Sequence, residues 1–106
     1  MAFAINDLDT GLKAYYQKNY KVAFDSFEKS AKAGYSFSQN EYGLLFAEGL
    51  GVEQDYYKAY AWISVAAETE NDQAIKNLKN FTQIFNIQEM KKAKELANQY
   101  KTLYLK

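Results

Sequence analysis

One stretch of the chain, residues 42–67, has the signals of a complete helix-turn-helix unit. Its sequence is YGLLFAEGLGVEQDYYKAYAWISVAA. Gly49 and Gly51 give the backbone the freedom to end a first helix in a left-handed turn, and Asp55 is placed to cap a second helix. Small and aromatic residues then recur at three- and four-residue steps and make one apolar helix face: Ala59, Trp62, Ile63, Ala66 and Ala67. The stretch therefore predicts two helices that approach each other closely.

The order of residues in this stretch resembles the Sel-one-like repeat family of tetratricopeptide-like proteins. The residues that carry the resemblance are Gly43, Phe46, Gly49, Gly51, Val52, Gln54, Asp55, Ala59, Trp62, Ala66 and Ala67. They cover one repeat cleanly and the flanking segments less well. The resemblance implies an all-α fold, namely a short right-handed α-solenoid of about two helix-turn-helix repeats and a C-terminal capping helix pair. It also implies a module that binds other proteins.

We expect a single domain over residues 1–106, because a chain of this length suits one core. Proline is absent, so no helix interior lacks a backbone N–H. Within the domain, repeat one is expected over residues 6–34 and repeat two over residues 36–69. A degenerate third repeat that acts as a cap is expected over residues 72–106, since an end unit must present one face to water.

Two sets of residues place the repeats in register. Gly11 in the first helix of repeat one corresponds to Gly43 in repeat two. Three positions of the second helix recur after 36 residues, which pairs Ala23, Phe27 and Ala31 with Ala59, Ile63 and Ala67. This register places Trp62 between repeat two and the unit that follows, where we expect it to be buried.

Polar residues mark where other helices begin. Asn6 or Asp7 is expected to cap the first helix of repeat one. Ser36 and Gln39 have the spacing of a capping box, which predicts a helix that begins near Phe37.

The C-terminal unit is expected to contain two helices. The first covers residues 72–84, and Asn86 with Glu89 forms an Asn-led capping box before the last helix. The last helix carries one apolar stripe: Met90, Ala93, Leu96, Ala97, Tyr100, Leu103 and Tyr104. This stripe requires a surface to pack against.

The composition removes most catalytic and nucleic-acid chemistry. The chain has no histidine and no cysteine, which excludes Ser-His-Asp and Cys-His arrangements and imidazole or thiolate metal sites. Its thirteen cations are all lysine and balance thirteen carboxylates, so neither net charge nor the arginine fork favours nucleic acid. Acidic pairs such as Asp7 with Asp9, or Glu68 with Glu70, lie at helix ends and turns, where solvated charges are common. We therefore expect no catalytic residue, no metal and no cofactor.

The N-terminus leaves the cellular location open. The uncharged run at residues 59–67 is far shorter than the roughly 18 apolar residues that a membrane span needs. Ala2-x-Ala4 has the form of the small-residue end of an export signal. One interpretation is that a signal was removed before Ala4 and that the protein is periplasmic or secreted. The other is an ordinary frayed terminus of a cytoplasmic protein.

The resemblance also predicts a binding surface. In tetratricopeptide-like proteins, the residues three before the first-helix glycine and one and four after it tend to face the concave surface. Counting from Gly11, Gly43 and the equivalent position Lys79 gives Leu8, Leu12, Tyr15, Asn40, Leu44, Ala47, Lys76, Asn80 and Gln83. The chain has two tyrosine doublets, Tyr15–Tyr16 and Tyr56–Tyr57. Adjacent helical residues point about 100° apart, so one tyrosine of each doublet is expected to be more exposed than the other. We expect the more exposed ones to be Tyr16 and Tyr57.

This predicted surface changes from apolar and aromatic to polar and basic along the chain. It suggests a protein or peptide partner with an apolar anchor near one end and an acidic or amide-rich end near Lys76. The alternative for its first part is that Leu8, Leu12 and Tyr15 are covered by residues 1–5. We expect a monomer.

Two functions remain open at this point. The first is a non-catalytic adaptor or scaffold that binds a partner through the concave face. The second is a small inhibitor or immunity-type protein that blocks a partner enzyme. Residues 1–70 carry ten acidic residues and six lysines, whereas residues 71–106 carry three acidic residues and seven lysines. The acidic body would suit a basic partner of such an inhibitor.

Overall fold

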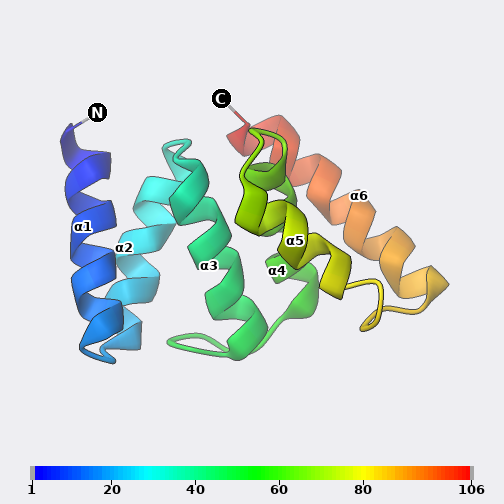
Figure 1. Cartoon of the computed structure of the whole chain (residues 1–106), viewed down its shortest axis with the longest axis horizontal. Helices are drawn as coiled ribbons and strands as arrows, with labels where there is room; N and C mark the ends of the chain where they lie inside the picture. Colours follow the sequence, from blue (N-terminus) through cyan, green and yellow to red (C-terminus); the bar gives the residue numbers. More distant parts are fainter. Residues whose placement is uncertain (1, 106) are drawn as a thin grey trace.

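The computed structural model describes the backbone of residues 2–105 and the side chains of residues 6–105. These residues form six α-helices and no strand, so the predicted all-α class is confirmed. The helices, shown in Figure 1, are α1 (Ala2–Tyr16), α2 (Tyr20–Lys32), α3 (Ser36–Glu48), α4 (Tyr56–Ala67), α5 (Asp72–Asn80) and α6 (Ile87–Tyr104).

The helices pack mainly on their neighbours along the chain. α1 packs on α2, α2 on α3, and α3 on α4. In Figure 1, α1, α3 and α5 follow one another from left to right, with α2 and α4 behind them. α4 also packs on both α5 and α6 and is therefore the centre of the C-terminal half. This is the layout of a short α-solenoid, in which each hairpin lies against the next.

Two glycines allow the helices of each hairpin to approach closely. A Cβ atom on Gly11 of α1 would lie 2.9 Å from Cε1 of Phe27 on α2. A Cβ atom on Gly43 of α3 would lie 2.7 Å from Cγ1 of Ile63 on α4. Both distances are shorter than van der Waals contact, so any larger residue would push the helices apart. The same pairing in both hairpins confirms the predicted register.

The loop between α3 and α4 has the predicted turn and cap. Gly49 is the C-cap of α3 with φ 69°, and Gly51 has φ 75°, so both occupy the left-handed region that favours glycine. Asp55 caps α4, because its Oδ1 accepts a hydrogen bond of 3.0 Å from the N–H of Lys58. The loop also reaches the preceding repeat, since a Cβ atom on Gly51 would meet the carbonyl oxygen of Tyr20 at the start of α2.

Most of the other motif residues line the core. Ala67 and Val52 are partly buried at its edge, and the Gln54 side chain donates to the carbonyl oxygen of Ala47 at 2.8 Å. The buried motif residues are Gly43, Phe46, Ala59, Trp62 and Ala66. The loop and the second helix of this repeat are thus fixed by the residues on which the resemblance rests.

The first helix begins earlier than predicted. α1 begins at Ala2, so Asn6 and Asp7 lie inside the helix and the prediction that one of them is its N-cap is wrong. Asn6 and Asp7 do not act as caps, because the preceding residues adopt helical geometry and extend the first turn. Residues 2–5 continue α1 along its axis. The alternative that residues 1–5 cover Leu8, Leu12 and Tyr15 concerns covering side chains that lie outside the described residues.

The predicted capping box at the start of α3 is also wrong. The Ser36 hydroxyl donates to the carbonyl oxygen of Ala66 on α4 at 3.2 Å. The Gln39 side-chain amide donates to the carbonyl oxygen of Ala31 at 3.1 Å and to that of Tyr104 at 3.4 Å. Both side chains bind carbonyl groups of other helices, so partners distant in sequence replace the local cap.

The C-terminal unit is not a regular hairpin. α5 ends at Asn80, before the predicted end at Ile84, because the chain tightens into turns such as the Ile84 N–H bond to the carbonyl oxygen of Phe81 at 3.1 Å. The capping box of Asn86 and Glu89 is confirmed, with bonds of 2.8 and 2.9 Å. α6 then packs on α4.

One residue of the predicted α6 stripe lies outside the core. Ala93 and Ala97 are buried, whereas Leu103 is 61% exposed. The last turn contacts the core through Tyr104, whose ring faces Trp62. Adjacent helical residues point about 100° apart, so this contact turns Leu103 toward solvent.

Candidate binding surfaces

We call the surface formed by α1, α3 and α5 the first-helix face. The predicted binding residues belong to these helices, except Gln83, which follows α5. Half-buried among them are Leu8, Leu12, Tyr15, Leu44 and Ala47. Exposed among them are Tyr16, Lys76, Asn80 and Gln83. The face therefore offers partly accessible apolar residues on α1 and α3 and polar residues on and after α5.

Asn40 is placed differently from the other predicted binding residues. It is buried, and its Oδ1 accepts a hydrogen bond of 3.1 Å from the side-chain amide of Asn77 on α5. Its place in the repeat pattern could not reveal this bond, because Asn77 is distant in sequence. Asn40 thus ties α3 to α5 and is not accessible to a partner.

Tyrosine rings gather at the C-terminal end of α1. The ring of Tyr15 lies 6.1 Å from that of Tyr16 and 5.7 Å from that of Tyr20, edge-on in both cases. Tyr16 is 79% exposed, which confirms that it is the outward member of its doublet. Burial, followed by the nearby carboxylates of Glu48 and Glu41, raises the pKa of Tyr15, so its hydroxyl stays protonated.

The second tyrosine doublet is oriented opposite to the prediction. Tyr56 is exposed, whereas Tyr57 is half-buried. The ring of Tyr57 stacks on that of Phe85, with centroids 5.1 Å apart and planes inclined by 12°. The ammonium of Lys92 on α6 lies 4.9 Å from the Tyr57 ring centroid. The prediction for Tyr57 is wrong because the connection before α6 covers it.

Two carboxylates that the motif comparison missed border the first-helix face. Glu41 and Glu48 lie on α3 on either side of Leu44, at helical spacings of three and four residues. Burial, and then the charge of Glu48, raises the pKa of Glu41. The sequence could have revealed these two glutamates, because they lie on the same side of α3 as the predicted binding residue Leu44. The α1–α3 part of the face is therefore apolar with an acidic border.

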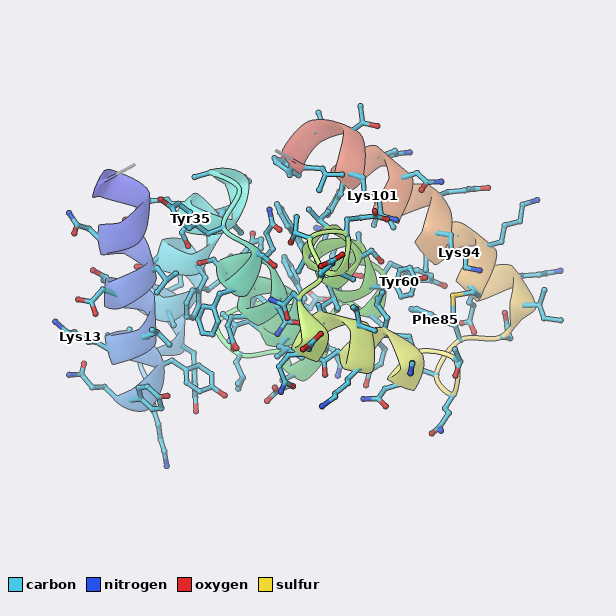
Figure 2. The ribbon with its side chains drawn as sticks, turned by 45° about the horizontal axis from the view of Figure 1, so that its top comes forward. Lys13, Tyr35, Tyr60, Phe85, Lys94 and Lys101 are labelled. Carbon is cyan, nitrogen blue, oxygen red and sulfur yellow. The ribbon has the colours of Figure 1, made fainter. Side chains whose placement is uncertain are left out.

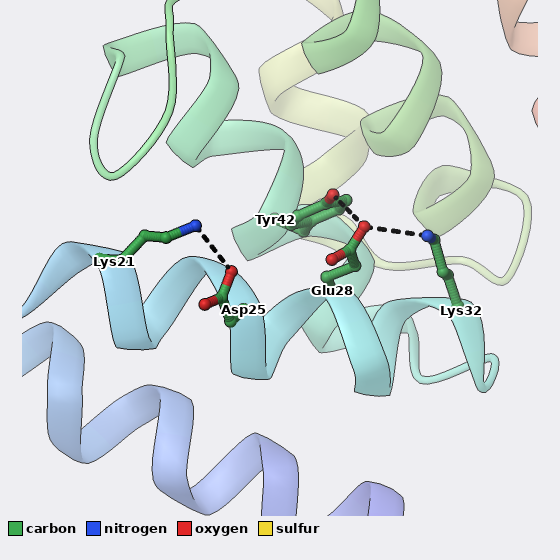
Figure 3. Close-up of polar contacts among 5 residues, drawn as sticks. All are labelled: Lys21, Asp25, Glu28, Lys32 and Tyr42. Carbon is green, nitrogen blue, oxygen red and sulfur yellow. Dashed lines mark hydrogen bonds and ion pairs between the residues drawn. The ribbon is translucent and has the colours of Figure 1, made fainter.

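A hydrogen-bonded carboxylate lies on the other side of α3. Figure 3 shows Glu28 of α2 between Tyr42 and Lys32: its Oε2 accepts from the Tyr42 hydroxyl at 3.1 Å and from the Lys32 ammonium at 2.9 Å. Burial, and then the Glu28 charge, raises the pKa of Tyr42, so the phenol remains a donor. The hydrogen bond to Glu28 raises the pKa of Lys32 because it stabilises the charged ammonium. This arrangement ties α2 to α3.

A groove between α5 and α6 was not predicted. Its volume is about 920 Å³, and Figure 2 shows Tyr60 of α4 and Phe85 between the two helices, with Lys94 on α6. Its apolar lining is Tyr60, Leu78, Phe85, Ile87 and Met90, and its charged lining is Lys79, Lys91, Lys94 and Glu95. The groove exists because α5 and α6 each pack on α4. The prediction of a capping helix pair did not include this separation.

The described residues offer neither a metal site nor a membrane-spanning helix. Residues 6–105 contain no group of three or more carboxylates, histidines or cysteines that could hold a metal ion. In the described part of the chain, each helix also falls short of the length and apolar character that crossing a membrane requires.

Comparison with known proteins identifies the fold. No protein-family model and no curated protein matches the chain. Its structure is similar to the crystal structure of a protective antigen that is present in uropathogenic Escherichia coli strains and displays an SLR fold. The TM-score is 0.85 at 28% sequence identity, and the match covers 93% of this chain but only 22% of that protein. The chain therefore has the α-solenoid fold of the Sel-one-like repeat (SLR) family, as the motif in residues 42–67 predicts.

Proposed function

We propose that the chain is a non-catalytic protein–protein interaction module whose first-helix face binds a peptide or a partner protein. The observation that carries the proposal is the exposure of Tyr16 beside the partly buried Tyr15, Leu12 and Leu44 on this face. Aromatic side chains supply contact area with few rotatable bonds, which suits them to binding surfaces. The SLR fold of the chain also favours a protein partner.

The charges along the first-helix face indicate the direction in which a partner segment would lie. Glu41 and Glu48 border its α1–α3 part, and the exposed Lys76 lies on α5. A segment with an apolar anchor beside Tyr16 and an acidic or amide-rich end near Lys76 would complement this order. A cationic side chain next to the anchor would add an attraction to the two glutamates.

Two features support a role without catalysis. The chain lacks the histidine and cysteine that most acid-base and nucleophilic sites use. The Glu28 carboxylate is already occupied by the Tyr42 hydroxyl and the Lys32 ammonium. These two bonds hold the carboxylate between α2 and α3, so its role in the protein is to join the two helices.

Capture of partners from the native organism, followed by amide chemical-shift mapping with the captured partner, tests this proposal. We expect shifts at Tyr16, Leu44 and Lys76, and a weaker complex with Tyr16→Ser. The matched control is Val22→Ser on α2, because Val22 is an exposed apolar residue outside the first-helix face. Shifts confined to α2 and α4, or equal weakening by both substitutions, would contradict the proposal.

A further inference from the structure

We propose that the groove between α5 and α6 is a second binding surface, which takes an acidic amphipathic helix of a partner protein. The inference goes beyond the proposed function, because the groove is lined by α4, α5, α6 and the connection before α6 and contains none of the predicted first-helix residues. The floor, the mouth and the charged rim of the groove each support it.

The floor of the groove is lined by the aromatic rings of Tyr60 and Phe85, which pack on the buried ring of Phe81. The ring of Tyr60 lies 5.6 Å from that of Phe81 and 6.1 Å from that of Phe85, and the Phe81 and Phe85 rings stack at 5.6 Å. Phe81 is buried, so this layer is anchored in the core. The groove is therefore already present in the free protein and does not have to open before a partner enters.

The mouth of the groove holds an apolar residue that the fold does not use. Ile87, the first residue of α6, is 90% exposed although it lines the groove. Leu78 and Met90 are partly buried beside it. A helix laid along the groove would cover these three side chains with its own apolar face, which is the usual way in which a groove between helices binds a helix.

The rim of the groove carries a positive charge that makes no ion pair among the described side chains. The exposed Lys79, Lys91 and Lys94 line it, against a single carboxylate, Glu95. Among residues 6–105 the ion pairs are made by other lysines, for example by Lys101 with Glu68 at 2.9 Å. Three free ammonium groups around an apolar floor complement a helix that has leucine-like residues on one face and carboxylates beside them.

The experiment uses the full chain and three synthetic helical peptides of about 15 residues, the length at which an isolated helix begins to be stable. The first peptide has leucines at helical spacing and glutamates elsewhere. The second has lysines in place of the glutamates, and the third has serines in place of the leucines. Amide chemical shifts and titration calorimetry report the position and the affinity of binding.

We expect only the glutamate-leucine peptide to bind, with shifts at Leu78, Ile87, Met90 and Lys94. Equal binding of the lysine peptide, shifts confined to the first-helix face, or no shifts up to about 1 mM peptide, which corresponds to a negligible affinity, would overturn the proposal. Self-association of the free protein that Ile87→Ser abolishes would also overturn it, in favour of a second copy as occupant.

Two substitutions separate the roles of charge and apolar contact. Lys79→Glu should weaken binding of the acidic peptide about fivefold, as expected for one exposed charge at a rim. The matched control is Lys29→Glu, because Lys29 is also an exposed lysine in the last turn of its helix, α2. Ile87→Ser should weaken binding without unfolding the protein. Equal affinities of Lys79→Glu and Lys29→Glu would remove the charge argument and overturn the assignment.

Discussion

The ring of Trp62 on α4 stacks on the ring of Tyr104 on α6, with centroids 4.6 Å apart and planes inclined by 29°. Trp62 also meets the rings of Tyr100 at 5.2 Å and of Tyr42 on α3 at 5.1 Å. It is 3% exposed, as the repeat register predicts. This single side chain therefore joins the second hairpin to the C-terminal helix.

Replacing Trp62 should destabilise the protein strongly. Trp62→Ala would remove the contacts with Tyr42, Tyr100 and Tyr104 and leave a cavity, which should lower the free energy of unfolding by roughly 3–5 kcal/mol. Trp62→Phe keeps an aromatic ring against Tyr104 and should cost clearly less. Chemical denaturation followed by far-UV circular dichroism measures both. Equal stabilities of Trp62→Ala and the wild type would contradict the role of this residue.

The two glycines of the α3–α4 loop should respond differently to alanine. Both have positive φ, which should cost an alanine about 1 kcal/mol at either position. At Gly49 the added Cβ has room, since its nearest neighbour is Cβ of Gln54 at 3.4 Å. At Gly51 it would collide with the carbonyl oxygen of Tyr20. Gly51→Ala should therefore lower the Tm more than Gly49→Ala, and the reverse order would contradict the contact between this loop and α2.

Features that depend on neighbours in sequence could be predicted. Gly49, Gly51 and Asp55 act within one loop, and Asn86 with Glu89 acts within one turn, so their roles follow from local backbone geometry. The apolar spacing of α4 selected residues that lie in or at the edge of the core, but it did not show that Ala61, Ser64 and Val65 on the other sides of this helix are buried as well. These local signals, together with the resemblance, were sufficient to predict the α-solenoid fold.

Features that depend on distant segments could not be predicted in this way. Ser36 and Gln39 match a capping box in sequence, but their partners are Ala66, Ala31 and Tyr104. The α5–α6 groove also depends on where α6 docks, and a regular hairpin would have closed it. For the first-helix face, repeat spacing selected the helices correctly but could not show that Asn40 is buried.

The side chain of Gln39 offers a direct test of these distant contacts. It is 2% exposed and donates to carbonyl oxygens on α2 and α6. Gln39→Met, which keeps the size but removes the donors, should cost about 1–2 kcal/mol and speed hydrogen exchange in the last turn of α6. Gln39→Glu should destabilise the protein more than Gln39→Met, because a carboxylate would face two carbonyl oxygens. A Glu variant as stable as the Met variant would contradict the two bonds.

Glu41 should make stability depend on pH. Burial raises its pKa in the folded state, so the folded protein binds this proton more tightly than the unfolded chain does. Its contribution to stability is then lost as the pH rises from the ordinary glutamate pKa of about 4.3 through the raised value. The charged form of Glu41 is partly desolvated and lies near the charge of Glu48, and Glu41→Gln removes both of these destabilising effects.

The test of Glu41 is a pH series of thermal unfolding. Glu41→Gln should raise the Tm at neutral pH, and its advantage should shrink below about pH 4, where the carboxyl is protonated in both folded and unfolded states. The control is Glu53→Gln, because Glu53 is an exposed acid in the loop before α4. A Glu41→Gln protein that is no more stable than wild type at neutral pH, or whose advantage grows on acidification, would show that Glu41 is held as a favourable charge.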